Sequence, residues 1–307
     1  MRKATRESYG NTLKELGYEN KDIVVLEADL SKATKTEIFG KKFPERFINV
    51  GIAEQNMIGM AAGLAAGGKI PFATTFAVFA AGRAFEIIRN SVCYPNMNVK
   101  IAATHAGITV GPDGGSHQAI EDIAIMSSLP NMIVLSPADD IEACKCVREA
   151  AKIKSPVYIR LGRIPLDDIY TEDYNFKIGK GSELVKGNDV TIIATGIMVH
   201  KALVAARELK EENINTRVIN ISTIKPIDEE IIIKAAKETK GIVTVEEHSI
   251  IGGLGDRVSS VVCDNHPTKV KKIGVKDVFG ESGNPDELLE KHGLTVSNII
   301  EKVKELL

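Results

Sequence analysis

Short apolar runs alternate with longer helical patterns along nearly the whole chain of 307 residues. The runs with the length and apolar character of buried strands are 22–26, 46–52, 70–76, 99–104, 132–135, 156–161, 190–195, 216–221, 241–246 and 270–275. Such alternation is typical of a parallel sheet with helices on both of its faces. The chain is therefore predicted to be an α/β protein.

The alternation is interrupted once, over residues 163–187. This segment contains a proline, several acidic residues and three glycines, which is typical of a connection between domains. The chain is also long enough for two domains that each have a core. We expect a first domain over residues 1–165, a linker over 166–187 and a second, smaller α/β domain over 188–307.

Composition and charge argue against nucleic acid and membranes as partners. The formal net charge is −2, so the chain offers no electrostatic attraction to a polyanion. No apolar run approaches the length of a membrane span, and polar residues follow directly after Lys3, where a signal peptide would be apolar. We expect a cytoplasmic protein.

One acidic residue, Glu54, stands where a predicted strand gives way to an apolar helix of small residues. A purely structural interpretation is that Glu54 is an acid in the first turn of the helix, where the helix N-terminus stabilises its negative charge. Gly59 and Gly63 are four residues apart and share one face of this helix. They would let another backbone or a ligand approach closely.

Other candidate functional side chains also follow predicted strands. In parallel α/β sheets, ligands bind beyond the carboxyl ends of the strands. That rule selects Asp29, Glu54, Phe76, Phe79, His105 and Arg163. Each has an ordinary explanation, since a phenylalanine pair is usually core packing and an arginine is usually solvated or ion-paired. Together they predict a site at one edge of the first sheet.

A loop rich in glycine, residues 107–118, precedes the next predicted helix. Its glycines let the backbone approach a ligand closely. The loop carries Asp113 and His117, and His105 lies just upstream. Two histidines and an aspartate suit the hydroxyl groups of a polar substrate. The alternative is a plain turn followed by a helix cap at His117.

In chain order, these motifs resemble the C-terminal half of transketolases, enzymes that use thiamine diphosphate. The segments that carry the resemblance are Arg2-Lys3-Ala4, Ala28-Asp29-Leu30, Gly51-Ile52-Ala53-Glu54-Gln55, Thr74-Thr75-Phe76-Ala77-Val78-Phe79, Thr104-His105-Ala106-Gly107, Gly111-Pro112-Asp113-Gly114-Gly115-Ser116-His117-Gln118 and Glu246-Glu247-His248. The resemblance is collinear over nearly the full chain. It implies a pyrimidine-binding domain followed by a transketolase C-terminal domain, as in the short subunit of split transketolases.

The resemblance implies a cofactor site on the first domain. Glu54 corresponds to the catalytic acid that exchanges a proton with the aminopyrimidine of thiamine diphosphate. Phe79 corresponds to the ring that stacks on the pyrimidine, Phe76 lines the same pocket, and Asp29 corresponds to the acid near the thiazolium. Some members of the family have a third aromatic residue in this pocket, where this chain has Gly82.

The resemblance also implies a substrate site. His105, Asp113 and His117 correspond to residues that contact the ketose hydroxyls, and the two histidines assist proton transfer as catalytic residues. Arg2 and Arg163 correspond to arginines that bind the phosphate of the sugar.

The family binds diphosphate and magnesium through a Gly-Asp-Gly triplet on another domain, and no such triplet occurs in this sequence. The resemblance therefore implies that Mg²⁺ is bound through a partner, the long transketolase subunit, and that this chain holds no metal itself. A second copy of the chain would complete a heterotetramer.

The implied reaction transfers a two-carbon ketol unit from a ketose phosphate to an aldose phosphate in the pentose phosphate pathway. The alternatives are the β subunit of a 2-oxoacid dehydrogenase decarboxylase, deoxyxylulose phosphate synthase, and a non-catalytic assembly module of the same fold. His105, Asp113, Arg2 and Arg163 favour sugar phosphates over oxoacids. The intact acid and histidines argue against a module without catalysis.

Overall fold

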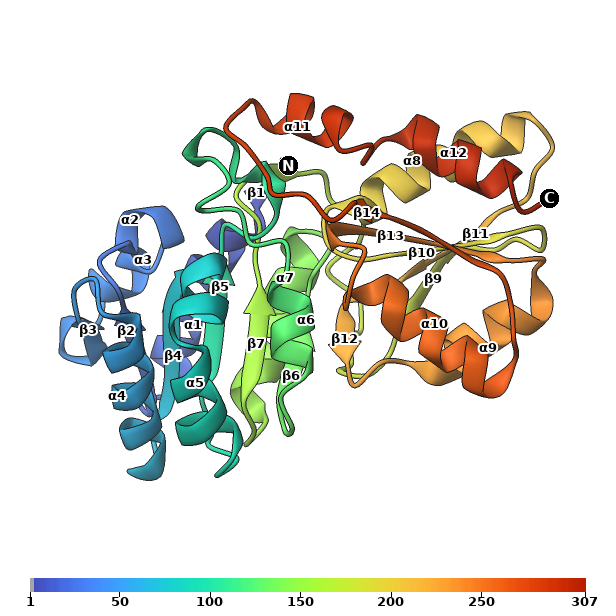
Figure 1. The fold of residues 1–307 in the computed structure, drawn as a ribbon. Coiled ribbons are helices and arrows are strands. Elements are labelled where there is room, and N and C mark those ends of the chain that lie inside the picture. Colours follow the sequence, from blue (N-terminus) through green and yellow to red (C-terminus); the bar gives the residue numbers. More distant parts are fainter. Residues whose placement is uncertain (1–2) are drawn as a thin grey trace.

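The computed structural model describes residues 3–307, so Arg2, which was predicted to bind phosphate, lies outside the described residues. Figure 1 shows two sheets side by side, each covered by helices. The predicted α/β class is confirmed, with a parallel sheet in the first half of the chain and a smaller α/β unit in the second.

The elements of the first half are β1 (Lys3–Ala4), α1 (Thr5–Glu19), β2 (Ile23–Glu27), α2 (Ser31–Thr34), α3 (Glu37–Gly40), η1 (Pro44–Arg46), β3 (Phe47–Asn49), α4 (Glu54–Ala66), β4 (Ile70–Phe76), η2 (Phe79–Arg83), α5 (Phe85–Ile87), η3 (Ile88–Cys93), β5 (Lys100–Thr104), η4 (Ile108–Asp113), α6 (Asp122–Ser127), β6 (Ile133–Leu135), α7 (Asp140–Lys152), β7 (Val157–Arg160) and β8 (Pro165–Leu166). Those of the second half are β9 (Ser182–Val185), β10 (Thr191–Ala194), α8 (Met198–Glu211), β11 (Arg217–Asn220), β12 (Thr223–Lys225), α9 (Glu229–Glu238), β13 (Ile242–Ser249), α10 (Leu254–Asn265), β14 (Val270–Val275), α11 (Pro285–Lys291) and α12 (Val296–Lys304).

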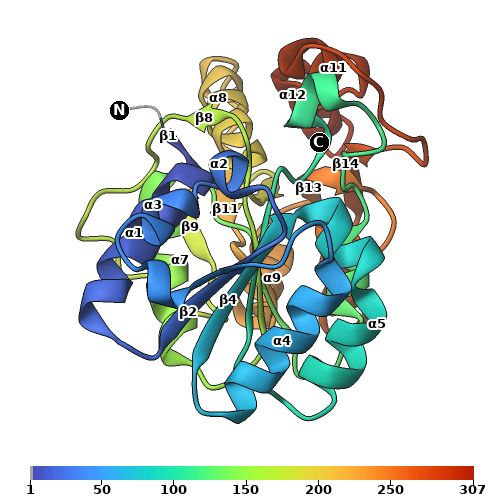
Figure 2. The same ribbon diagram turned by 90° about the vertical axis from the view of Figure 1, so that its left-hand side faces the viewer.

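The first sheet has the strand order β12-β6-β7-β5-β4-β2-β3, and all of its pairs are parallel except β12 with β6. Helices α1 and α7 cover one face, where Leu13 and Val147 are buried together. Helix α4 and the turns η2 and η3 cover the other face, and Figure 2 shows these two layers on either side of the strands. The parallel arrangement brings the carboxyl ends of β2, β3, β4, β5 and β7 to one edge.

The second sheet has the order β14-β13-β10-β11-β9, with β9 antiparallel to its neighbour. Helices α8 and α12 lie on one side of it, and α9 and α10 lie on the other (Figure 1). The core does not stop between the sheets. One buried apolar cluster includes Met57 and Val134 from the first half and Ile193 and Ile219 from the second.

The segment expected to connect the domains, 166–187, contributes a strand to the second sheet. Within it, β9 pairs with β11. In addition, β12 comes from the second half of the chain but pairs with β6 of the first sheet, with Thr223 opposite Leu135. The domain boundaries themselves stay a prediction.

The strand predicted over 46–52 ends at Asn49, because Gly51 has a φ of 74° and turns the chain out of the sheet. Between β4 and β5 the chain forms two wider helical turns, η2 and η3, around the short α5. Over residues 3–307, no helix has the length and apolar character needed to traverse a lipid bilayer.

Lys100 is fully buried at the start of β5, on the side of the sheet away from the candidate site. Its amine donates to the carbonyl oxygens of Ile153, at 2.6 Å, and Ser155, at 2.7 Å. Burial lowers the pKa of Lys100 to about 7. The folded chain therefore holds Lys100 mostly as the neutral amine at pH values above about 7.

We predict that Lys100 makes the stability of the fold increase with pH above neutrality. The unfolded lysine has a pKa near 10.4, so between about pH 7 and 10 the unfolded chain binds more protons than the folded one. Relative to Lys100→Met, the wild type should gain up to about 1.4 kcal/mol in free energy of unfolding per pH unit from pH 7 to 9. Urea unfolding at several pH values measures this, with exposed Lys210→Met as the control. A difference between wild type and Lys100→Met that is constant with pH would contradict the prediction.

Candidate functional site

The candidate site lies at the edge where the parallel strands of the first sheet end. Asp29 follows β2, and Glu54 opens α4 just after β3. Phe76 is the last residue of β4, His105 follows β5, and Arg163 follows β7. Because these strands are parallel neighbours, side chains far apart in the sequence lie at one edge.

Aromatic rings form one wall of the site. The rings of Phe76 and Phe79 are nearly parallel, with an interplanar angle of 7° and centroids 6.0 Å apart. The imidazole of His105 stacks on Phe76 at 3.9 Å, and that of His117 meets Phe79 edge-on at 5.4 Å. A flat heterocycle can stack on such a wall.

The carboxylate of Glu54 is buried beside this wall, with only 1% of the residue exposed. Its Oε2 accepts a hydrogen bond of 2.7 Å from the guanidinium of Arg83. The side chain of Arg83 is 47% exposed, and its guanidinium carbon lies 4.5 Å from the ring centroid of Phe79. A buried carboxylate needs a positive or hydrogen-bonding partner, and in this structure Arg83 supplies one.

Arg6 is a residue of this site that the sequence analysis missed. Its Nη1 donates to the carbonyl oxygen of Ala33, at 2.8 Å, and lies 3.0 Å from His105 Nε2. Its buried Nε has no hydrogen-bond partner in the structure. The strand-end rule could not select Arg6, since it precedes the first predicted strand. The pairing of β1 with β8, just after Arg163, brings it to the site.

His105 is neutral in this environment. Burial, followed by the positive charges of Arg6 and Arg163 and by His117, lowers the pKa of His105 to about 3. Arginine can only donate, so His105 Nε2 accepts from Arg6. Its Nδ1 then carries the hydrogen and donates to Thr104 Oγ1 at 2.9 Å.

The loop of residues 107–118 brings Asp113 and His117 to the same edge. Arg163 Nη1 donates to the carbonyl oxygen of Val110 and lies 3.3 Å from Asp113 Oδ2. The imidazole of His117 forms a hydrogen bond of 3.0 Å with Ser116 Oγ. Around His105 the edge thus combines Arg6, Arg163, His117 and Asp113, which suits an anionic substrate with several hydroxyl groups.

A second acid, Glu27, lies near the predicted Asp29 and was not selected from the sequence. Asp29 exchanges hydrogen bonds with the side chain of Asn49, at 3.0 and 3.1 Å. Glu27 is fully buried at the end of β2 and accepts from Thr34 Oγ1 at 3.0 Å. Burial raises the pKa of Glu27 to about 7. Glu27 directly follows the predicted strand 22–26, so the strand-end rule could have found it, but only Asp29 was selected.

The groups present fit an aminopyrimidine better than a metal ion. Glu54 offers a carboxylate at the rim of an aromatic wall, which matches a flat ring that carries hydrogen-bonding nitrogens. The half-exposed Arg83 covers Phe79 and would have to turn outward to uncover that face. Among residues 3–307, no cluster of three or more histidine, cysteine or acidic side chains could hold a metal ion.

Comparisons with known proteins relate the chain to a family of known sequences and structures. The sequence matches the families "Transketolase, pyrimidine binding domain" over residues 1–167 and "Transketolase, C-terminal domain" over residues 179–299. A protein of Methanocaldococcus jannaschii, named for a transketolase C-terminal section, is 55% identical over 99% of this chain and 96% of its own length. A 6-deoxy-6-sulfo-D-fructose transketolase subunit of a Clostridium species is 43% identical over 98% of this chain and 94% of its own.

One solved structure covers nearly the whole chain. It is described as a split gene transketolase in an inactive β4 tetramer, with a TM-score of 0.93, 57% identity, and coverage of 99% of this chain and 98% of that one. Human transketolase is 39% identical over 99% of this chain, which spans about half of the human protein, 49% of its length.

We predict that the imidazole of His105 stays neutral across the physiological pH range and that Arg6 helps to keep it so. In a pH titration followed by nuclear magnetic resonance, the His105 signal should show no inflection above about pH 5, because its pKa lies near 3. Arg6→Gln should raise the pKa of His105, since it removes one of the charges that lower it. The His105 signal is identified as the one that is missing from the spectrum of the His105→Gln variant. An inflection of wild-type His105 between about pH 6 and 7 would contradict the prediction.

Proposed function

The chain belongs to the transketolase family, and on that premise we propose that it is the pyrimidine-binding subunit of a ketol transferase that uses thiamine diphosphate. The observation that carries this proposal is the buried carboxylate of Glu54 at the rim of the Phe76–Phe79 wall. A cluster of arginines and histidines lies at the same edge of the sheet.

Glu54 is the proposed catalytic acid. The chemistry supplied by thiamine diphosphate, when bound, is a nucleophilic carbon and a sink for the electron pair released when the ketose carbon–carbon bond breaks. Glu54 would exchange a proton with a pyrimidine nitrogen, once that nitrogen takes the place of the Arg83 guanidinium. Phe79 would support the ring by stacking, with Phe76 behind it. Asp29 is proposed to face the thiazolium end of the cofactor.

The cationic groups of the site are proposed to bind a sugar phosphate. Arg6 has a buried Nε without a partner, and Arg163 is near enough to His105 for its positive charge to lower the pKa of the imidazole. Together they would bind the phosphate and fix the far end of the sugar. Neutral His105, with Asp113 and His117, would then hydrogen-bond the sugar hydroxyls and move their protons. Arg6 is proposed to act in addition to Arg2, which the resemblance assigns to the same phosphate.

The site is proposed to be completed by other chains. Ile52 is 78% exposed two residues before Glu54, and Gly59 and Gly63 on α4 and Gly82 on η2 face open space. An apolar and small-residue surface of this kind suits contact with another subunit. A long transketolase subunit would bind the diphosphate and Mg²⁺, and a second copy of this chain would complete a heterotetramer.

We propose that the reaction moves a two-carbon ketol unit from a ketose phosphate to an aldose phosphate, within the non-oxidative pentose phosphate pathway. The two arginines support an anionic sugar as substrate. The relative named for 6-deoxy-6-sulfo-D-fructose suggests that a sulfonate could take the same place as a phosphate. A phosphorylated and a sulfonated ketose, assayed side by side, would distinguish the two.

Ketol transfer is predicted to require both this chain and its long subunit. With xylulose 5-phosphate, ribose 5-phosphate, thiamine diphosphate and magnesium, the pair should be active and this chain alone inactive. Glu54→Gln should lower kcat by a factor on the order of 10²–10⁴, because it removes the acid that exchanges the proton. Exposed Glu86→Gln on α5 is the matched control. Oxoacid decarboxylation by the pair, or no reaction from an assembled pair, would overturn the proposal in favour of the alternative functions.

The arginine pair is predicted to select for phosphorylated sugars. Arg6→Gln should raise the KM of a ketose phosphate by about tenfold to a hundredfold, since it removes a charge-assisted hydrogen bond. The same change should affect an unphosphorylated ketose much less. Exposed Arg207→Gln on α8 controls for the loss of a positive charge. Equal losses for the two sugars would exclude Arg6 as a phosphate ligand.

A further inference from the structure

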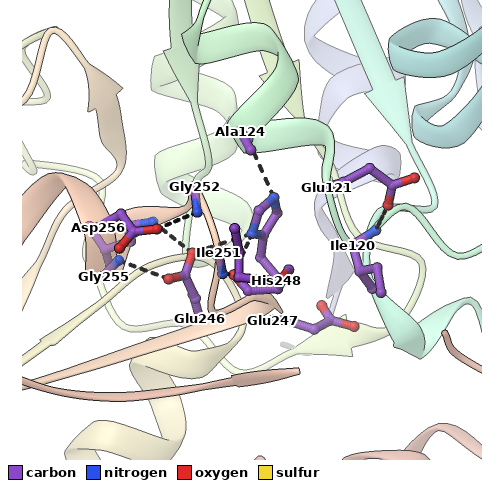
Figure 3. Close-up of polar contacts among 12 residues, drawn as sticks. Ile120, Glu121, Ala124, Glu246, Glu247, His248, Ile251, Gly252, Gly255 and Asp256 are labelled. Carbon is purple, nitrogen blue, oxygen red and sulfur yellow. Dashed lines mark hydrogen bonds and ion pairs between the residues drawn. The ribbon is translucent and has the colours of Figure 1, made fainter. Parts of the chain in front are cut away.

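Three consecutive polar residues, Glu246, Glu247 and His248, lie at the carboxyl end of β13 in the second sheet, and all three are buried. Figure 3 shows their side chains pointing in different directions. Glu246 accepts from the N–H groups of Leu254 and Gly255, at 2.7 and 2.8 Å, and so caps α10. His248 Nε2 lies 3.4 Å from the backbone nitrogen of Ala124 in α6. Glu247 points toward neither helix.

The carboxylate of Glu247 reaches the first half of the chain. It is 3% exposed, and its Oε1 accepts a hydrogen bond of 2.7 Å from the backbone N–H of Thr109. It also packs against Gly107, where a Cβ atom would lie only 2.2 Å from the Glu247 carboxyl carbon. Gly107 has a φ of 81° as well, so both space and backbone conformation require glycine there.

The backbone of Glu247 is also held in place from the first sheet. Arg160, at the end of β7, donates from Nη2 to the carbonyl oxygen of Glu247 at 2.8 Å. The same guanidinium donates from Nε to Asp122 at 2.9 Å. Burial raises the pKa of Glu247 to about 7 despite the nearby positive charge of Arg160. The carboxylate thus has a fixed position between two sheets.

The loop that Glu247 contacts is the one that carries substrate-site residues. It begins two residues after His105 and includes Asp113 and His117. Thr109 and Val110 lie in η4, where the carbonyl oxygen of Val110 accepts from Arg163, and η4 ends at Asp113. A displacement of Thr109 would therefore shift Asp113 and the contact that orients Arg163.

A second segment of the C-terminal half contacts the same loop. Ser282 Oγ donates to the carbonyl oxygen of Pro112 at 2.7 Å, and Gln118 Nε2 donates to that of Glu281 at 2.9 Å. A Cβ atom on Gly115 would lie 2.4 Å from the carbonyl oxygen of Gly280. The C-terminal half therefore contacts the loop near its start, middle and end.

We propose that Glu247 is a positioning residue for the substrate site. It fixes the loop of residues 107–118 so that Asp113 and His117 face the substrate, although Glu247 itself does not touch substrate or cofactor. This inference rests on the proposed function of the site. It gives the C-terminal half of the chain a direct part in substrate binding.

Amide hydrogen exchange on the full chain tests the positioning without any assay of activity. Glu247→Asp keeps the charge but withdraws the carboxylate by one methylene group, so the peptide covering 105–119 should exchange about tenfold faster or more. Glu246→Asp is the matched control, because it shortens a neighbouring buried acid that caps α10 instead. Glu247→Gln keeps an acceptor oxygen and should largely restore protection. Unchanged exchange in Glu247→Asp, or an equal change in Glu246→Asp, would overturn the proposal.

Kinetics with the reconstituted pair test the consequence for substrate. Glu247→Asp should raise the KM of the ketose phosphate by about tenfold, since the loop binds substrate. Its kcat should fall less than that of Glu54→Gln, because the catalytic acid Glu54 lies outside this loop. A KM that equals the wild-type value in an active pair would overturn the proposal. If the wild-type pair shows no ketol transfer, the proposed function fails, and the exchange experiment alone then decides whether Glu247 positions the loop.

Discussion

The buried guanidinium of Arg160 joins the two halves of the molecule. It belongs to β7 of the first sheet, pairs with Asp122 of α6, and donates to the backbone of β13 in the second sheet. A buried arginine is costly unless its N–H groups have partners, and here Asp122 and the carbonyl oxygen of Glu247 supply them. Together with the shared apolar core, this group holds the two sheets against each other, close to the loop of residues 107–118.

Charge is distributed unevenly over the candidate site, and this divides it into two parts. On one side the carboxylate of Glu54 lies next to aromatic rings and forms an ion pair with the half-exposed Arg83. On the other side Arg6 and Arg163 surround a neutral histidine, and Arg6 Nε has no partner. The first part suits an uncharged heterocycle, whereas the second suits the anionic end of a substrate. The order of the strands in the sheet sets this division.

Much of the fold could be predicted because strand periodicity is a local property. The parallel sheet and most of its strands follow from short apolar runs, and the strand-end rule selects Glu54 and His105 without further knowledge. Arg6 could not be predicted this way, because the pairing of β1 with β8 that brings it to the site joins distant residues. The role of Glu247 was equally inaccessible, since it depends on how two sheets meet.

Strand β12 has a consequence for the first domain taken by itself. It crosses from the second half of the chain and covers the free edge of β6. Without it, the backbone N–H and C=O groups along that edge would be unpaired, and such an edge can recruit strands from other molecules. By pairing with this edge, the second half of the chain removes a site where the first sheet could aggregate. This is a physical reason for the two halves to remain on one polypeptide.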